Sequence, residues 1–534
     1  MLLEVKDLKL HIDEAEEELL KAIEKKLRIG SQNVKEYRIL KKSIDARKKG
    51  SIYFLYNVSV ELDDCRNYEK LINNKDILEH QEFQYVTTYF GEEKLEGRPV
   101  IIGSGPAGLF AALILAQGGY RPLILERGAD VDSRTNDIEA FMSDGIFSER
   151  SNIQFGEGGA GAFSDGKLTT RIKDIRIKLV LSSFVDFGAP KEILYEYKPH
   201  IGTDILKTVI KNMRNFIVGL GGEFRFNSFV DEIIERDGKA VGVHVKDLGN
   251  ISSNAIIGAI GHSARDTYEM LFDKGLSMEP KPMAIGVRVE HLQEMINKAQ
   301  YGSFAGHPRL GAADYMLTHR SESTGRSAYT FCMCPGGYVV PAASEKERLV
   351  VNGMSFHDRA GENANSAIVV GIYPEDFGDN HPLSGISFQR LWEEKAYNLG
   401  GGGYTAPVQL VGDFLCDKPS KGFEAVKPTY RPGVELVELK NCLPGFVTTA
   451  LKEAIISLDN KLKGFAQPEG ILTAIETRTS SPVRLLRGTT MESESLKNFY
   501  PAGEGAGYAG GIMSSAVDGI KVAEAIMKRF KPLD

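Results

Sequence analysis

A glycine-rich turn between an apolar strand and a helix is the feature that most constrains this chain. The strand is expected at 99–102, the turn contains Gly103, Gly105 and Gly108, and the helix is expected at Pro106–Gln117. Gly103 permits the tight turn, Gly105 lets the backbone approach a pyrophosphate, and Gly108 allows the helix to pack closely on the strand. The N-terminus of that helix presents unpaired N–H groups and the positive end of its dipole to phosphate. The segment therefore predicts a βαβ unit that binds a dinucleotide.

The strand that follows this helix ends in an acid. It is expected at 122–125, and Glu126 stands 23 residues after Gly103. A carboxylate at this point can accept hydrogen bonds from both ribose hydroxyls of an adenosine. It would repel a 2′-phosphate, so an NADP site at this turn is not expected. The fingerprint by itself does not distinguish FAD from NAD.

The C-terminal segment favours FAD. Residues 499–511 lead into a helix expected at about 514–527, in which Ser515 and Asp518 are interpreted as a capping pair. The segment is similar to the strand–Gly–acid–Gly segment of glutathione-reductase-type flavoproteins, which holds the ribityl chain. In those proteins the following helix points its N-terminus at the flavin pyrimidine ring, where it stabilises the anionic reduced flavin. Glu504 stands where Asp is more usual, which lengthens the reach of its hydrogen bond.

A third cluster of glycines lies between these two segments. Residues 154–167 contain five glycines within eleven positions. Such a loop lets the backbone come close to a flat or anionic group, and its position matches the loop that crosses the flavin in related enzymes. A mobile surface loop is the alternative interpretation. Two later strands fit the same site, one within 221–233, where Val230 is expected beside the adenine, and one at 255–260.

These segments together predict one FAD site. The residues expected to contact the cofactor are Gly103, Ser104, Gly105, Pro106, Ala107, Gly108, Glu126, Arg127, Gly158, Gly159, Ala160, Gly161, Ser164, Lys167, Val230, Gly261, His262, Gly503, Glu504, Gly511 and Ile512.

Longer strings are more specific than the glycine pattern. SNIQFGEGGAGAFSDGKL, GHSARDTYEML, CPGGYVV, VVNGMS, GENANSA and RTSSPVRLLR occur across most of the chain. With them the chain resembles a bacterial family of FAD-dependent proteins often labelled NAD(FAD)-utilising dehydrogenases. The resemblance implies FAD binding, a small N-terminal domain and a domain inserted between the halves of the FAD-binding domain. It implies no particular substrate.

The fold class expected is α/β, with a Rossmann-type FAD-binding domain, an inserted substrate domain and a small α+β N-terminal domain. The chain of 534 residues is too long for one compact core. The expected boundaries are 1–95 for the N-terminal domain, 96–279 and 467–534 for the two parts of the FAD-binding domain, and 280–466 for the insert.

The N-terminal domain is expected to be a ferredoxin-like sandwich. Strands are predicted at 2–10, 37–40 and 52–62 and a helix at 13–27, and the polar segment 73–97 is interpreted as a linker.

The net charge of the chain and its apolar runs limit the classes of binding partner that are expected. The net charge of −7 gives no general attraction to DNA or anionic lipid. Between Lys21 and Gly50, however, there are eleven Lys or Arg and three acids. That stretch is either a solvated face or a surface for RNA or a nucleotide. The apolar run 100–116 is broken by glycines and is interpreted as a buried strand and helix, and no secretory signal is recognised, so a cytoplasmic location without membrane contact is expected.

Several side chains are candidates for catalysis. Arg478 and Arg484 could clamp a carboxylate or stabilise reduced flavin, or belong to an ordinary ion-paired turn. His262 could exchange protons beside the cofactor or be structural. Cys332 and Cys334 could form a redox pair beside the flavin, although buried structural thiols are favoured, and no cysteine spacing indicates a metal site.

The function expected is a FAD-dependent oxidoreductase that acts on an organic substrate of unidentified structure. No second G-x-G-x-x-G unit occurs in the insert. Transient NAD(P)H, the substrate itself and a protein donor therefore remain open as sources of electrons. The alternative function is a flavin-containing RNA- or nucleotide-binding protein that uses the basic N-terminal stretch.

Overall fold

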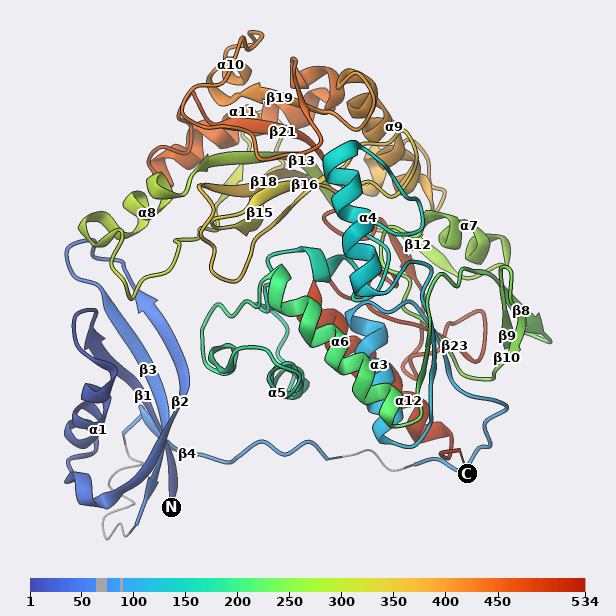
Figure 1. Cartoon of the computed structure of the whole chain (residues 1–534), viewed down its shortest axis with the longest axis horizontal. Coiled ribbons are helices and arrows are strands. Elements are labelled where there is room, and N and C mark those ends of the chain that lie inside the picture. The colour runs from blue at the N-terminus through green and yellow to red at the C-terminus, as the bar shows by residue number, and fades with distance from the viewer. Residues whose placement is uncertain (64–73, 87–89, 534) are drawn as a thin grey trace.

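The computed structural model describes residues 1–63, 74–86 and 90–533 (Figure 1). In this part of the chain a small N-terminal module, a unit built on a parallel sheet and a larger inserted sheet are each visible. Cys65, one of the five cysteines, lies outside the described residues.

The N-terminal module is an antiparallel sheet with strand order β2-β3-β1-β4, on which α1 packs. Its elements are β1 (Leu2–His11), α1 (Leu19–Leu27), β2 (Val34–Asp45), β3 (Tyr53–Leu62) and β4 (Ile77–Glu79). α1 buries Leu19, Ile23 and Leu27, the apolar stripe that the helical spacing predicts. β4 corrects the interpretation of 73–97 as a linker, because Ile77 is buried and pairs with Val5 of β1.

The second part is built on a parallel sheet with strand order β23-β11-β5-β6-β7. Its elements are β5 (Val100–Ile102), α3 (Pro106–Gln117), β6 (Leu123–Leu125), α4 (Val131–Asp144), α5 (Arg176–Asp186), α6 (Thr203–Gly219), β7 (Glu223–Arg225), β11 (Ile256–Gly258), α7 (Arg265–Asp273), β23 (Phe499–Pro501) and α12 (Ile512–Arg529). Helices α6, α3 and α12 lie side by side against it (Figure 1). α3 is buried on all sides, which explains the apolar run at 100–116.

An antiparallel meander covers this part, formed by β8 (Val230–Arg236), β9 (Lys239–Val245) and β10 (Gly249–Ser252). It corrects the prediction of one strand within 221–233. The chain instead forms β7 in the parallel sheet and β8 in the meander, with residues 226–229 between them. Val230 therefore begins a strand of the meander.

The insert contains a seven-stranded sheet with order β14-β15-β18-β13-β21-β19-β20. The elements from β12 onward are β12 (Met278–Pro280), β13 (Met283–Leu292), α8 (Gln293–Tyr301), β14 (Thr318–Arg320), β15 (Ser327–Cys334), β16 (Tyr338–Pro341), β17 (Val351–Met354), β18 (Asn363–Ile372), α9 (Ser384–Leu399), β19 (Ala406–Leu410), α10 (Val411–Leu415), β20 (Val434–Leu436), α11 (Gly445–Lys461), β21 (Ile471–Glu476) and β22 (Val483–Leu485). β21 pairs with β13 on one side and β19 on the other. The expected boundary at residue 466 therefore separates β21 from the sheet to which it is hydrogen-bonded.

The N-terminal module contacts both other parts. Arg309 of the insert donates from Nη1 to the carbonyl oxygen of Ile12 at 2.8 Å, and to that of Glu14. On the other side, the Lys42 amide donates to Tyr195 and the Tyr197 amide donates to Lys42. Among the helices of the described ranges, none has the length and apolarity to cross a membrane.

Candidate flavin-binding site

A cavity opens at the carboxyl edge of the parallel sheet, where it meets the glycine loop and the insert. In open α/β sheets this edge is where ligands bind. The residues expected to contact FAD that line the cavity are Gly103, Ser104, Gly105, Pro106, Ala107, Glu126, Arg127, Gly159, Ala160, Gly161, Ser164, Lys167, Val230, Gly261, His262, Glu504, Gly511 and Ile512.

Three expected contacts lie behind the cavity wall instead. A Cβ on Gly108 would stand 2.0 Å from the Gly103 carbonyl oxygen, one on Gly158 would stand 2.4 Å from Ile210, and one on Gly503 would stand 2.7 Å from Ala107. These glycines allow neighbouring segments to pack, and their expected direct contact with the cofactor is corrected to a supporting role.

The turn before α3 leaves room at one glycine. Gly103 has a φ of +99°, and a Cβ there would stand 2.4 Å from the Ala259 carbonyl oxygen. At Gly105 the nearest atom to a Cβ would be 3.8 Å away, so this position faces open space. Gly105 is also the N-cap of α3, and no side chain caps that helix. Free backbone donors at a helix start are suited to a phosphate group.

Glu126 accepts hydrogen bonds from both the turn before α3 and the glycine loop. One carboxylate oxygen accepts from the amide of Ser104 at 2.9 Å and its hydroxyl at 2.7 Å, and the other accepts from the amides of Gly128 and Gly156 at 3.0 Å each. These four donors use the usual acceptor capacity of a carboxylate. A ribose hydroxyl could therefore bond to Glu126 only by sharing an oxygen that already accepts from these donors. The contact with ribose remains a prediction. The sequence did not indicate this structural role.

The guanidinium of Arg127 lies within cation–π distance of two aromatic rings. Its guanidinium carbon is 4.4 Å from the centre of the Phe155 ring and 4.7 Å from that of Phe229. Asp266 and Thr267 accept hydrogen bonds from the guanidinium. Phe155, Phe229 and Thr267 also line the cavity and were not predicted, because nothing in their spacing relates them to Arg127.

The glycine loop is ordered by a buried arginine. The fully buried side chain of Arg134 donates to the carbonyl oxygens of Asn152, Ile153, Gly156 and Glu157 at 2.6–3.2 Å. Residues 151–158 are buried. The alternative of a mobile surface loop is therefore wrong. Arg134 lies in a polar helix and has no local signature, so sequence reasoning missed it.

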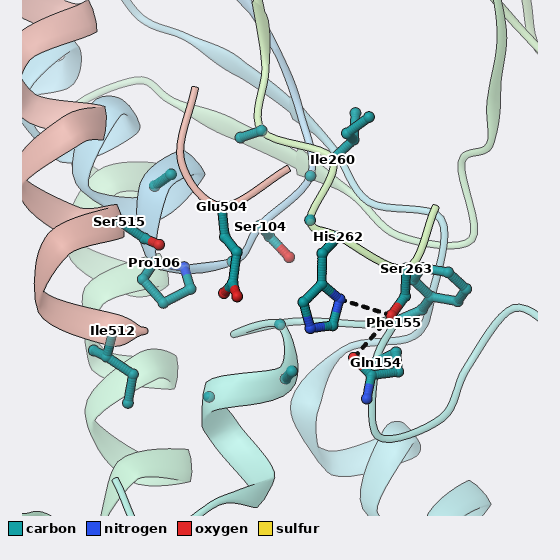
Figure 2. Close-up of a pocket in the computed structure, with 18 of the residues that line it drawn as sticks. Ser104, Pro106, Gln154, Phe155, Ile260, His262, Ser263, Glu504, Ile512 and Ser515 are labelled. Atoms are coloured by element: carbon teal, nitrogen blue, oxygen red, sulfur yellow. Dashed lines mark hydrogen bonds between the residues drawn. The ribbon is translucent and has the colours of Figure 1, made fainter. Parts of the chain in front are cut away.

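Glu504 and His262 project into the cavity from adjacent segments (Figure 2). Burial raises the pKa of Glu504 to about 7. Burial and the neighbouring guanidinium groups of Arg478 and Arg265 lower the pKa of His262 to about 3, so its ring is neutral near pH 7. Its Nδ1 lies 2.9 Å from the Ser263 hydroxyl, which donates to Gln154.

The start of α12 also faces the cavity. Its N-cap is Gly511, with a φ of +98°, and no side chain caps the helix. The predicted capping pair of Ser515 and Asp518 is wrong. Asp518 instead accepts from the Gly503 amide at 2.7 Å and from both terminal nitrogens of Arg487, because it lies on the second turn of the helix, beyond the uncapped end.

The two candidate catalytic arginines, Arg478 and Arg484, do not both line the cavity. Arg478 lines the cavity, but its guanidinium is held by Glu393 at 3.1 and 3.3 Å and by Ser344. Arg484 pairs with Glu279 at 3.0 Å on a partly exposed strand and is not part of the cavity wall. Both arginines are ion-paired, which favours the alternative of an ordinary ion-paired turn over an arginine clamp.

The insert contributes Phe331, Cys332 and Asn352 to the cavity wall. Cys332 is partly exposed, whereas Cys334 is buried. The expectation that both thiols are buried therefore holds for Cys334 only.

These observations fit FAD. Two uncapped helix N-termini, those of α3 and α12, border one cavity, and Gly105 and Gly511 both leave space for a ligand beside them. The positive ends of the two helices suit a pyrophosphate and the anionic part of a reduced flavin. Fold and cavity together define an α/β flavoprotein.

Comparison with known proteins gives the family. Residues 282–479 match the family described as FAD-dependent protein, C-terminal domain-like, and residues 3–61 match a domain of unknown function, DUF8436. An uncharacterized protein of Clostridium beijerinckii is 52% identical over 530 residues, which are 99% of each chain. The chain therefore belongs to the same family as that protein, and the match of residues 282–479 supports a FAD-dependent family.

Solved structures resemble the chain only distantly. Glycine oxidase from Bacillus cereus aligns at 12% identity over 81% of this chain and 95% of its own, with a TM-score of 0.34. A geranylgeranyl bacteriochlorophyll reductase-like protein of Thermoplasma acidophilum aligns at 12% identity over 81% and 78%, also with a TM-score of 0.34. Likenesses at this level carry no argument about activity.

The basic stretch of the N-terminal module is largely paired with acids. With acids of the described residues, six of its eleven basic side chains form ion pairs, namely Lys21–Glu18, Lys26–Asp76, Lys35–Glu61, Arg38–Glu36, Lys42–Glu16 and Arg47–Asp45. This pairing favours a solvated face. RNA binding remains a hypothesis.

Proposed function

We propose that this protein is a FAD-dependent oxidoreductase that acts on a small or medium-sized organic substrate. The observation that carries the proposal is the meeting of the uncapped N-termini of α3 and α12 at one cavity, to which the insert contributes a wall. When bound, the flavin supplies the electron or hydride transfer, and the protein holds it and manages protons.

The binding roles that we propose follow the cavity. Gly105 and the start of α3 would hold the pyrophosphate, and Glu126 the adenosine ribose. Glu504 and the start of α12 would hold the ribityl chain and the pyrimidine ring. NAD(P)H, if it is the reductant, would bind transiently, because the insert has no second glycine-rich βαβ unit. A protein electron donor remains open.

Glu504 suits proton exchange better than His262 does. A group exchanges protons most effectively when its pKa lies near the working pH. Burial raises the pKa of Glu504 to about 7, whereas the pKa of His262 is lowered to about 3 by burial and two arginines. We therefore propose that His262 acts as a neutral hydrogen-bonding group, and that Glu504 can hold or release a proton at its carboxyl.

The proposal is tested by the absorption spectrum of the purified protein, followed by anaerobic titration with NADH and NADPH. Flavin bands near about 375 and 450 nm that bleach with one nucleotide would support an NAD(P)H-linked enzyme. Flavin bands that bleach with neither nucleotide would indicate a substrate dehydrogenase or a protein electron donor. A colourless protein that takes up no added FAD would overturn the proposal.

A further inference from the structure

The wall that the insert contributes contains two neighbouring thiols on an irregular strand. β15 pairs with β18 from Ala328 to Phe331, but its register slips before Cys334, which pairs with Asn365. At the slip Cys332 has a φ of +44°, in the left-handed region that only glycine adopts readily. Strained residues of this kind persist where the surrounding structure holds them, and they cluster at functional sites.

Arg288 of β13 holds this strained segment. From Nη2 it donates to the Cys332 carbonyl oxygen at 2.6 Å, and the same atom lies 3.9 Å from the Cys334 sulfur. From Nη1 it donates to Glu476 at 2.8 Å. The Cys334 thiol donates to the Cys332 carbonyl oxygen at 3.3 Å. The two cysteines therefore share one anchor, and Cys332 lines the cavity while Cys334 lies behind it.

The surroundings of the pair shift the pKa values of the two thiols in opposite directions. Lys167 lines the same cavity and pairs with Asp165 at 3.1 Å, which in turn pairs with Arg359. The neighbouring Cys334 thiol, aided by Lys167 and Arg288 and opposed by burial and Asp165, lowers the pKa of Cys332. The neighbouring Cys332 and burial raise the pKa of Cys334. A thiolate with a protonated thiol beside it is the arrangement from which thiol–disulfide exchange starts.

We propose that Cys332 and Cys334 form a redox-active dithiol in the flavin cavity, an inference that rests on the proposed flavin function. Oxidation forms one S–S bond from the Cys332 thiolate and the Cys334 thiol. It releases the Cys334 proton and two electrons, which pass to the oxidised flavin. In the opposite direction the disulfide would take up two electrons and one proton to restore the Cys332 thiolate and the Cys334 thiol, and a bound reduced flavin would supply the electrons.

The substrate class that this pair would serve is a thiol or disulfide compound. Cys332 lines the cavity, so its thiolate would attack a substrate disulfide and release one substrate thiolate. Cys334 would then displace the second substrate sulfur as a thiol, leaving the Cys332–Cys334 disulfide for reduction by the flavin.

The test counts electrons in the flavin-loaded protein. After oxidation with diamide and removal of the reagent, anaerobic titration with dithionite should consume four electrons per flavin, two for the flavin and two for the disulfide. Cys332→Ser and Cys334→Ser should each consume two, and Cys416→Ser, which removes an exposed cysteine elsewhere in the insert, should still consume four. Two electrons in the natural protein, or four in Cys332→Ser, would overturn the proposal.

A second measurement needs neither flavin nor a variant. Trypsin should release residues 327–346 as one peptide that contains both cysteines, because Arg326 precedes it and Lys346 ends it. After diamide this peptide should weigh two hydrogens less and take no iodoacetamide, and after reduction it should take two labels. A peptide that takes two labels after diamide would overturn the dithiol. A protein without flavin bands would instead overturn the proposed function.

Discussion

Of the three glycines at 103, 105 and 108, Gly105 has the most open space beside it. A Cβ on Gly103 or Gly108 would stand 2.4 or 2.0 Å from a backbone oxygen, whereas a Cβ on Gly105 would stand 3.8 Å from its nearest neighbour. Gly103 and Gly108 are therefore needed to build the turn, and Gly105 is needed to keep the cavity open.

Gly105→Val should yield a folded protein that does not retain FAD, because the new side chain would occupy the expected pyrophosphate position. The flavin absorbance of the purified variant measures retention, and circular dichroism reports folding. Gly219→Val is the matched control, since a Cβ at this exposed helix end meets nothing within 4 Å. A folded Gly105→Val variant with full flavin content would show that the pyrophosphate does not lie at this turn.

Glu126→Ala should affect both stability and cofactor binding. It leaves the amides of Ser104, Gly128 and Gly156 without their acceptor, which should lower the free energy of unfolding by about 1–3 kcal/mol for each orphaned donor. Loss of the ribose contact should weaken FAD by about 1.5–3 kcal/mol. Urea unfolding of the apoprotein and FAD titration separate these effects, with the exposed Glu494→Ala as control. Unchanged FAD affinity would mean that the acid does not meet the ribose.

At the scale of elements, the segment between β23 and α12 places an acid beside a helix start. Asp518 of α12 anchors Gly503 and pairs with Arg487, so the segment is fixed to the helix that follows it. The next residue, Glu504, is thereby held in a half-buried position facing the cavity. The fold thus keeps an ionisable group where its charged form is costly.

Glu504 should make the apoprotein less stable as the pH rises. Burial raises its pKa from 4.5 to about 7, so between these values the folded protein holds a proton that the unfolded chain has released. Stability falls across this window. Glu504→Gln cannot ionise, so its free energy of unfolding relative to the natural protein should increase between pH 5 and pH 8, by on the order of 3 kcal/mol. Urea unfolding at both pH values measures the change, and a constant difference would contradict the raised pKa.

At the scale of the whole molecule, Arg309 is one of the contacts by which the N-terminal module docks on the insert, beside the pair of His307 with Asp13 at 3.2 Å. Arg309 donates to the carbonyl oxygens of Ile12 and Glu14, and its guanidinium lies 4.8 Å from the centre of the Phe54 ring. The apolar core of the module is continuous with that of the insert. The module is therefore expected to be stabilised by the rest of the chain.

Arg309→Ala should loosen this docking. The lost hydrogen bonds and ring contact should lower the local stability of β1 and β3 by about 1–3 kcal/mol. Hydrogen exchange of the amides in these two strands measures the effect, with the exposed Arg320→Ala of the same insert as control. Equal exchange in both variants would mean that the apolar core alone holds the module.

The sequence by itself determined the features that depend on neighbouring residues. The bounds of α3, the roles of Gly103 and Gly105, and the placement of Glu126 and Glu504 at one sheet edge follow from local backbone geometry and from the rule that parallel strands end at the same edge. A motif of this kind predicts its own surroundings, because its physical requirements are met within a few residues.

The tertiary structure decided what depends on distant partners. Glu393 lies 85 residues from Arg478 and pairs with it, which favours an ion-paired turn over the predicted clamp, and Arg134 orders a glycine loop about 20 residues away. β21 closes the insert beyond the expected boundary because its partners are β13 and β19. Cys332 reaches the cavity through a slip in register that no spacing in β15 reveals. Such contacts join segments that no local pattern relates, so only the folded chain determines them.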